Sequence, residues 1–365
     1  MRFVYFTHSL RSCWNHGNAH FLRGVLRELL ASGHDIRSYE PEAGWSVTNL
    51  LAEPTGPAAF GAFARDFADL SPNIQMLRPD LDAMLDGADV VLVHEWNDPL
   101  LVAAIGKHRR RAGRYLLLFH DTHHRAVTDP AAMDALDLDG YDAVLAFGES
   151  LACVYRAAGW GSRVFVWHEA ADTRLFRPVA SETERNGAVW IGNWGDNERS
   201  AELHAYLLDP VRSLNLPLDI YGVRYPRPAL DDIAAIDARY RGWLPNARVP
   251  EVFSRHLMTV HVPRHAYASQ LPGIPTIRVF EAMACGIPLI CAPWTDTEYL
   301  FHSGTDYLVA RTSAEMQAHM AHLRADASAR GTLTANGLET IRARHTCAHR
   351  VKELLGIVRD LGMAA

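Results

Sequence analysis

The stretch PTIRVFEAMACGIPLICAP, residues 275–293, decides the fold class because a helix, a turn and a strand follow one another in it. Thr276 is a plausible helix N-cap, and the helix is expected to run through Glu281. Gly286 is a natural C-terminal stop, and Pro288 leads into an apolar strand at 289–292. A helix returning directly into a buried strand is typical of α/β proteins with parallel sheets.

The same alternation extends in both directions from this stretch. In the second half we expect further strands at 188–191, 218–221 and 257–262, and helices from about 201 and at 229–238. In the first half a helix is expected at 19–32, closed by Gly33, among strands at 3–7, 35–39, 88–94, 115–119, 143–147 and 164–167. Such runs, apolar on both faces, belong to buried parallel sheets.

The length of 365 residues predicts about two domains. The polar segment 173–186 is the best linker candidate. We therefore expect two doubly wound, Rossmann-like α/β domains facing a central cleft. The first would span 1–180 and be completed by a C-terminal helix within 346–365, and the second would span 187–345. Ligands of such sheets bind beyond the carboxyl ends of the strands, which here means in the cleft.

The amino-acid composition restricts the classes of ligand and partner that the protein is expected to bind. With 36 Lys+Arg against 42 Asp+Glu, the net charge of −6 argues against nucleic-acid binding. Only Lys107 and Lys352 are lysines, so 34 basic residues are arginines and a phosphate clamp would use arginine or backbone N–H groups. Five scattered cysteines without CxxC spacing indicate neither a disulfide framework nor a zinc site, and we expect a cytoplasmic protein.

Membrane contact is expected to be peripheral at most. The N-terminus has no signal-peptide apolar region, and no later segment has 18 consecutive apolar residues. The basic run 107–111 with Arg114 would suit anionic lipid, but its alternative interpretation is a solvated helix end.

Glu281 is the first candidate for a binding residue. It occupies the second turn of the expected helix among apolar neighbours, and burying an unpartnered carboxylate would be costly. It is therefore expected to face a ligand hydroxyl or a solvent-lined cleft. The alternative is a surface glutamate on an amphipathic helix. The helix start at Thr276 would also attract an anion.

The segment EAMACGIPLI, 281–290, resembles a motif of retaining, nucleotide-sugar-dependent glycosyltransferases with the GT-B fold, of the family 4 type. The residues Arg278-Val279-Phe280-Glu281 resemble the spore-maturation-protein-like branch of this family more than its other members. The resemblance implies that Glu281 binds the donor ribose, with Thr276 and Arg278 among the donor contacts. The family has a second glutamate eight residues earlier, where this chain has Gly273, so that contact is missing or made differently.

Other passages match the family in the expected order. Residues 141–159 and 168–178 resemble the end of the family's first domain, and 189–200 resembles the first strand and loop of its donor domain. There Asn193 and Arg199 stand at or near the family's diphosphate-binding pair, although Arg199 is equally interpretable as a helix-surface arginine. In the passage 241–256, the resemblance implies a base pocket lined by Gly242, Trp243 and Leu244.

The first domain contributes two further candidate groups. Gly17 and Asn18 open a helix after the first strand, where the family covers the donor phosphates; the alternative is a simple tight turn. His120 inherits the family's histidine contact to the donor sugar. By itself the cluster of His120, Asp121, His123 and His124 would also suit a metal ion.

Together these features predict a glycosyltransferase that moves a sugar from a nucleoside-diphosphate sugar to an unidentified acceptor hydroxyl, with His120 and Arg199 as catalytic residues. The resemblance implies retention of configuration without a metal or any other cofactor, and Asp137-Leu138-Asp139 is only a near match to a metal-binding acidic triplet. Residues 40–81 are expected either to shape the acceptor pocket or to form covering helices and loops. The alternatives are a sugar-nucleotide epimerase or phosphorylase on the same fold, and a non-catalytic sugar-nucleotide-binding protein.

Overall fold

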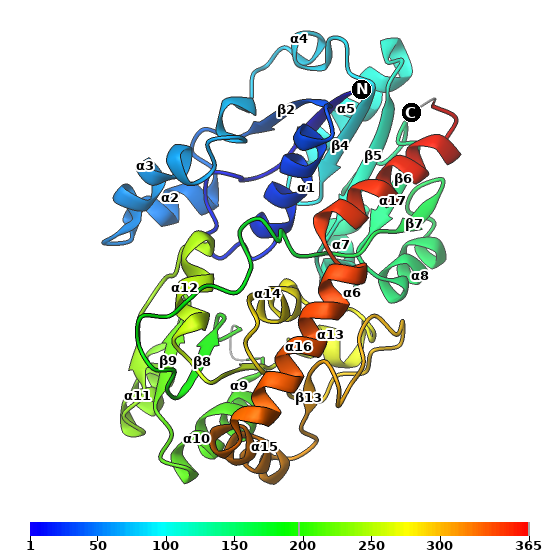
Figure 1. Ribbon diagram of the computed structural model, residues 1–365. Helices are drawn as coiled ribbons and strands as arrows, with labels where there is room; N and C mark the ends of the chain where they lie inside the picture. The colour runs from blue at the N-terminus through cyan, green and yellow to red at the C-terminus, as the bar shows by residue number, and fades with distance from the viewer. Residues whose placement is uncertain (196–197, 364–365) are drawn as a thin grey trace. The chain divides into compact units, whose positions relative to one another are not determined.

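The computed structural model describes residues 1–195 and 198–363, and its chain forms two compact units (Figure 1). Unit 1 comprises Met1–Glu169 and Cys347–Ala365, and unit 2 comprises Ala170–Thr346. The units therefore divide after Glu169, earlier than the end near residue 180 that the sequence indicates for the first domain.

Unit 1 is built on a seven-stranded parallel sheet with strand order β3-β2-β1-β4-β5-β6-β7. The chain runs outward from β1 through β2 to β3 and then returns to place β4 on the other side of β1. The carboxyl ends of β1 and β4 are therefore the topological switch point of this sheet. The strands are β1 Arg2–Phe6, β2 Asp35–Glu40, β3 Ile74–Met76, β4 Val90–His94, β5 Leu116–Asp121, β6 Ala143–Ala146 and β7 Val164–Val166.

Helices complete unit 1, and the first and last of them pack together (Figure 1). The C-terminal helix is bonded to the residue that follows β7, because Trp167 Nε1 donates to the carbonyl of Arg350 at 2.8 Å. The helices are α1 Ala19–Ala31, α2 Trp45–Ala52, α3 Gly56–Asp66, η1 Ser71–Asn73, α4 Leu81–Leu85, α5 Pro99–Ala112, α6 Arg125–Thr128, α7 Pro130–Asp134, α8 Glu149–Ala158 and α17 Cys347–Asp360.

Unit 2 repeats this plan with a six-stranded parallel sheet of order β10-β9-β8-β11-β12-β13. Its switch point lies between the carboxyl ends of β8 and β11. The strands are β8 Ala188–Ile191, β9 Leu218–Tyr221, β10 Arg239–Tyr240, β11 Met258–His261, β12 Leu289–Cys291 and β13 Leu308–Val309.

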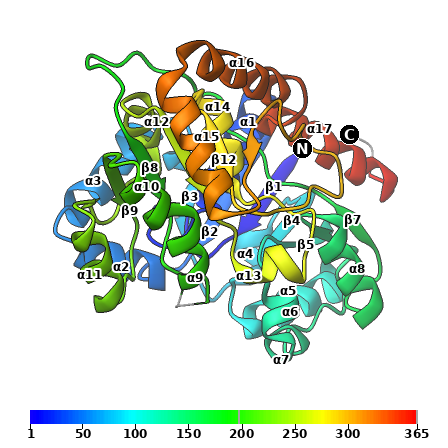
Figure 2. The ribbon, with the colours of Figure 1, turned by 90° about the horizontal axis from the view of Figure 1, so that it is seen from below.

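The helices of unit 2 bury the apolar faces of this sheet. Leu203, Val211 and Met316 share one core cluster with the strands, whereas α14 contacts β11, β12, α12 and α16. Figure 2 shows α14, α15 and α16 lying close together. The helices are α9 Ser200–Leu203, a π-helical turn η2 His204–Leu208, α10 Asp209–Ser213, α11 Arg227–Ala235, η3 Asn246–Arg248, α12 Val249–Ser254, α13 His265–Ser269, α14 Ile277–Cys285, α15 Ser313–Ala325 and α16 Ala327–Arg344.

The helix–turn–strand stretch behaves as the sequence predicts. Thr276 is the N-cap of α14, and Gly286 ends the helix with φ +67°. Because L-residues with a side chain rarely adopt that conformation, glycine is the natural residue there. Strand β12 then begins at Leu289.

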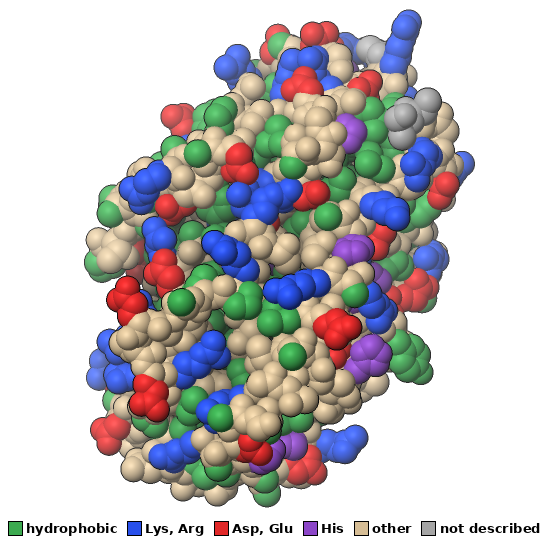
Figure 3. All heavy atoms as spheres, in the orientation of Figure 1, with side chains coloured by type: hydrophobic (Ala, Val, Ile, Leu, Met, Phe, Trp, Pro, Cys, Tyr) green, Lys and Arg blue, Asp and Glu red, His purple; other side chains and the backbone are tan. Residues whose placement is uncertain are grey.

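The surface carries charges of both signs. On the face in Figure 3, Lys and Arg side chains are interspersed with Asp and Glu side chains. The arginines of the basic run lie in the last turn of α5, where Arg109 pairs with Asp142 and Arg111 with Asp82. Among the helices of the described residues, none combines the length and the apolar character needed to cross a bilayer.

Candidate functional site

Arg199 ties together the two loops at the switch point of unit 2. It is the N-cap residue of α9, and its guanidinium donates to the carbonyl oxygens of Val262 at 2.6 Å, Asn193 at 2.5 Å and Trp194 at 3.4 Å. Burial lowers its pKa to about 10, so the group still carries its charge at neutral pH. The expected phosphate ligand thus also fixes the loops after β8 and β11.

Asn193 links the loops after β8 and β9. Its Oδ1 accepts from the backbone N–H of Val223 at 3.0 Å. The two loops approach so closely that a Cβ on Gly222 would lie 2.0 Å from the carbonyl oxygen of Gly192. Only glycine fits at that contact. Asp196 and Asn197, in the passage that the sequence assigns to the diphosphate, lie outside the described residues.

The residues expected to line a base pocket follow β10 directly. The carbonyl of Gly242 accepts from the N–H of Gly222 at 2.9 Å, which joins this segment to the loop after β9. Trp243 and Leu244 are half-buried. The buried indole Nε1 of Trp243 has no hydrogen-bond partner within the described part of the chain, which is uncommon for a buried N–H group.

Glu281 is fully buried and held by two side chains. Arg278 forms an ion pair with it within α14, and Asn246 Nδ2 donates to its Oε1 at 3.3 Å. The alternative of a surface glutamate is therefore wrong. Asn246 was not expected from the sequence, although it lies in the passage assigned to the base pocket.

The start of α14 is tied to β11 through a histidine. His261 Nε2 contacts Thr276 Oγ1 at 3.0 Å, and the structure gives Thr276 no side-chain capping bond. Burial, together with the positive charges of Arg199 and Arg278, lowers the pKa of His261 to about 3. His261 is thus a neutral imidazole within reach of the charges of both expected donor-binding arginines.

Gly273 has a structural reason for replacing the glutamate of the resembled family. Its φ is +92°, and a Cβ there would lie 2.0 Å from Thr297 Oγ1. A side chain at this position would require both a strained backbone and a displaced neighbour. The departure from the family pattern is therefore built into the loop that precedes α14.

In unit 1 the expected residues lie at the carboxyl ends of β1 and β5. Asn18 is the N-cap residue of α1, next to Gly17, and its Nδ2 donates to the carbonyl of Thr122 at 3.0 Å. His120 is fully buried in β5, with its Nδ1 hydrogen-bonded to Tyr5 Oη at 2.5 Å. Burial lowers the pKa of His120 well below its ordinary value. Its Nε2 has no described partner.

Asp121 and Asp139, the acidic residues of the two sequence patterns considered for a metal ion, are engaged within the fold. Asp121 accepts from the N–H of His123 at 2.8 Å and from Tyr155 Oη at 2.7 Å. Asp139 pairs with Arg110 on α5. Within residues 1–195 and 198–363, no three or more His, Cys, Asp or Glu side chains are grouped so as to hold a metal ion.

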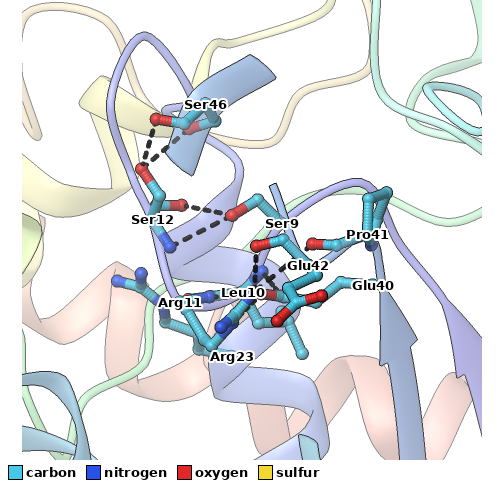
Figure 4. Close-up of polar contacts among 9 residues, drawn as sticks. All are labelled: Ser9, Leu10, Arg11, Ser12, Arg23, Glu40, Pro41, Glu42 and Ser46. Atoms are coloured by element: carbon cyan, nitrogen blue, oxygen red, sulfur yellow. Dashed lines mark hydrogen bonds and ion pairs between the residues drawn. The ribbon is translucent and has the colours of Figure 1, made fainter. Parts of the chain in front are cut away.

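The loop between β1 and α1 is anchored by a buried carboxylate. Glu40, at the end of β2, accepts from the backbone N–H groups of Leu10 and Arg11 and pairs with the Arg11 side chain (Figure 4). Ser12 Oγ donates to the carbonyl of Ser46 at 3.0 Å. These bonds fix the course of the loop that carries His8 and His16.

Comparison with known proteins agrees with this architecture. Residues 198–356 match the family model described as glycosyl transferase-like. No relative among the curated proteins matches the chain.

Solved structures match over nearly the whole chain. Sucrose-phosphate synthase from Thermosynechococcus elongatus is 14% identical with a TM-score of 0.65, covering 99% of both chains. HepE from Anabaena, solved with UDP and glucose, is 12% identical with a TM-score of 0.69, covering 99% of this chain and 100% of its own. BGT of phage T4, solved with its UDP-glucose substrate, is 11% identical with a TM-score of 0.62, covering 100% of both chains.

The chain thus has the GT-B fold, with two Rossmann-like domains. The stretch 198–356, which matches the glycosyl transferase-like family model, contains Arg199, Gly242 and Glu281.

Proposed function

We propose that this protein transfers a sugar from a nucleoside-diphosphate sugar to an acceptor hydroxyl. The observation that carries the proposal is that His261, at the end of β11, connects the two groups of expected donor-binding residues: it contacts Thr276 at the start of α14 and its pKa is lowered by the charges of both Arg199 and Arg278. All of these residues lie in the stretch that matches the glycosyl transferase-like family model. Two proteins of similar fold were solved with UDP or UDP-glucose, which makes UDP-glucose the first donor to test.

The donor nucleotide would be held through three kinds of contact. The Glu281 carboxylate accepts from the ribose hydroxyls, while Arg278 and Asn246 keep it oriented. The segment Gly242–Leu244 lines the base, where Trp243 offers its indole N–H. Arg199 and the amide groups at the start of α14, near Thr276, face the diphosphate.

The chemistry needs stabilisation of the departing diphosphate. As the bond to the sugar breaks, negative charge develops on the leaving oxygen, and a fixed arginine with oriented amides stabilises it. We propose that Arg199 has this role, that Asn193 fixes its loop, and that the neutral His120 contacts the sugar near the reacting carbon. We further propose a family 4-type reaction of the spore-maturation-like branch, with retention of configuration and without a metal, in the cytoplasm.

The assay follows release of the nucleoside diphosphate. The full chain is incubated with UDP-glucose, and then with other nucleotide sugars, each with and without pooled hydroxyl acceptors. Acceptor-dependent release of the diphosphate, with an α-linked product from an α-linked donor in NMR spectra, supports retaining transfer. An altered sugar still attached to the nucleotide would indicate an epimerase instead, and phosphate-dependent formation of a sugar phosphate would indicate a phosphorylase. Binding without turnover would indicate a binding protein.

Two variants make the assay specific to the site. Glu281→Ala removes the ribose contact and is expected to abolish detectable turnover at moderate donor concentrations. Glu339→Gln changes an exposed carboxylate on α16 and is the matched control, expected to retain turnover. Equal loss in both variants would contradict the assignment of Glu281.

A further inference from the structure

Buried polar atoms without partners gather at the switch point of unit 1. Native structures leave few such atoms unsatisfied, so a cluster of them indicates a polar ligand or ordered water. Those near the carboxyl ends of β1, β4 and β5 are Thr7 Oγ1, His8 Nδ1, His16 Nε2, His94 Nδ1 and His120 Nε2.

The imidazole rings of this group form a continuous histidine cluster, namely His8, His16, His94 and His120. The ring centroids of His8 and His16 are 3.9 Å apart, and His94 lies 5.5 Å from His8 and 5.6 Å from His120. His8 follows β1 and His94 ends β4, so two members flank the switch point itself. In sheets of this class that point is where ligands bind.

The imidazoles of the cluster are neutral at pH 7, although the positive charge of Arg125 acts on His8 and His94 and that of Arg23 acts on His16. Burial lowers the pKa of His8 and His16 well below the ordinary value, and that of His94 to about 3. Burial also raises the pKa of the neighbouring Glu95 to about 8, so its carboxyl is largely protonated at pH 7. Each neutral imidazole has one donor and one acceptor nitrogen, which matches a hydroxyl group better than a phosphate, because a hydroxyl both donates and accepts.

An aromatic ring lies beside the cluster. Trp96 is 40% exposed, and its ring centroid lies 6.3 Å from that of His8. The guanidinium of Arg125 lies 4.1 Å from the Trp96 ring centroid, and its Nη2 donates to the carbonyl of Glu95. A partly exposed indole next to hydroxyl partners suits a ring with an apolar face and polar edges.

The histidines are held in place before any ligand arrives. The loop carrying His8 and His16 is fixed by Glu40 and Ser46, as Figure 4 shows for its central residues. His94 Nε2 contacts Glu95 Oε2 at 2.8 Å and Thr122 Oγ1 at 3.1 Å, whereas its Nδ1 has no partner among the described residues. Such preorganisation reduces the entropy cost of binding.

We propose that His8, His16 and His94, with Trp96, bind a free neutral sugar or polyol. Naming this ligand as the acceptor rests on the proposed transfer function, whereas the binding itself does not. The site lies within unit 1 and needs no nucleotide. His120, the one ring of the cluster that the proposed transfer assigns to the donor sugar, lies 5.6 Å from His94 and is not among the proposed ligands of the free sugar.

Binding is tested on the full chain without nucleotide, by saturation-transfer NMR and calorimetry. The probes are glucose, galactose, mannose, sucrose and myo-inositol, together with glucose 6-phosphate. At least one neutral probe is expected to bind, and glucose 6-phosphate is expected to bind more weakly than glucose. Trp96→Ala and His8→Phe should each lower the affinity for the neutral probe by about tenfold. The first substitution removes an aromatic contact surface, and the second removes a hydrogen-bonding nitrogen.

Matched controls separate this site from the donor site. Leu100→Ala alters a side chain that is 80% exposed near Trp96 and should leave probe binding unchanged. Circular dichroism verifies that each variant is folded, and thermal shifts with UDP-glucose verify that donor binding is retained. If the protein binds UDP-glucose but none of the neutral probes, the proposed sugar site is overturned, whereas the proposed transfer function is not. Probe binding that survives both substitutions, or a loss confined to UDP-glucose binding, would also overturn it.

Discussion

Arg278 and Glu281 lie one turn apart on α14 and form an ion pair whose carboxylate is fully buried. A carboxylate removed from water is tolerated only when its partners are present, so the guanidinium of Arg278 and the amide of Asn246 determine its orientation.

Arg278→Met should therefore destabilise the protein strongly. The substitution removes the guanidinium that neutralises the buried Glu281 carboxylate, and breaking a buried pair costs about 3–5 kcal/mol. Differential scanning calorimetry at pH 7 measures the loss. The control is Arg227→Met on α11, whose pair with Asp231 is solvent-exposed and should contribute little. Equal melting temperatures for the two variants would show that the Arg278–Glu281 pair is not important for stability.

Gly273→Glu should not restore a working family contact. The new side chain would meet Thr297 and force a strained φ, so we expect a loss of roughly 1–3 kcal/mol and no gain in activity. Gly304→Glu is the control, because Gly304 also has a positive φ but a Cβ added there would meet no other atom within 4 Å. Thr297→Ala in the Gly273→Glu background should recover part of the difference. A stable and more active Gly273→Glu protein would contradict this account of the loop.

Arg199→Lys should fail to replace the arginine even though it keeps the charge. Lysine cannot reach the carbonyls of Asn193, Trp194 and Val262 at once, so the loops after β8 and β11 lose their connection. We expect affinity for a nucleotide sugar to fall at least about tenfold, together with a lower melting temperature, measured by calorimetry. Unchanged affinity would mean that the connection that Arg199 makes between these loops is not needed for nucleotide-sugar binding.

Stability should decrease between pH 6.5 and 8, and Glu95 should be one cause. Burial raises the pKa of Glu95 from 4.5 to about 8, so in this range the folded state holds a proton that the unfolded chain has released. Unfolding then releases a proton, and the free energy of unfolding falls as pH rises. Burial and the charge of Glu95 also raise the pKa of Asp121 to about 8. Glu95→Gln should flatten the decrease measured by urea titration; identical slopes would refute the assignment.

Much of the fold follows from local sequence patterns. Strands β8 and β9 have the predicted bounds, and α14 begins after Thr276 and ends at Gly286 as expected, because apolar runs and capping residues are short-range signals. Short edge strands such as β3 and β13 carry too few residues for a clear pattern. The long helix α16 was not predicted, and its weakly segregated apolar residues explain why.

The candidate site was predictable only where a motif exists. Glu281 and Arg199 lie in recognisable passages, whereas the partner Asn246 and the bonds from Arg199 to backbone carbonyls depend on how loops from separate strands meet. The histidine cluster of unit 1 draws on three strand ends far apart in the sequence. Such contacts depend on tertiary packing, so no local sequence pattern predicts them.

The most direct test of the central claim is a calorimetric titration of the full chain and of Glu281→Ala with UDP, UDP-glucose and other nucleotide sugars. The account predicts that the wild-type chain binds at least one nucleotide sugar and that Glu281→Ala weakens this binding by more than about tenfold. Absence of heat with every nucleotide sugar, or equal affinity in the two proteins, would contradict it.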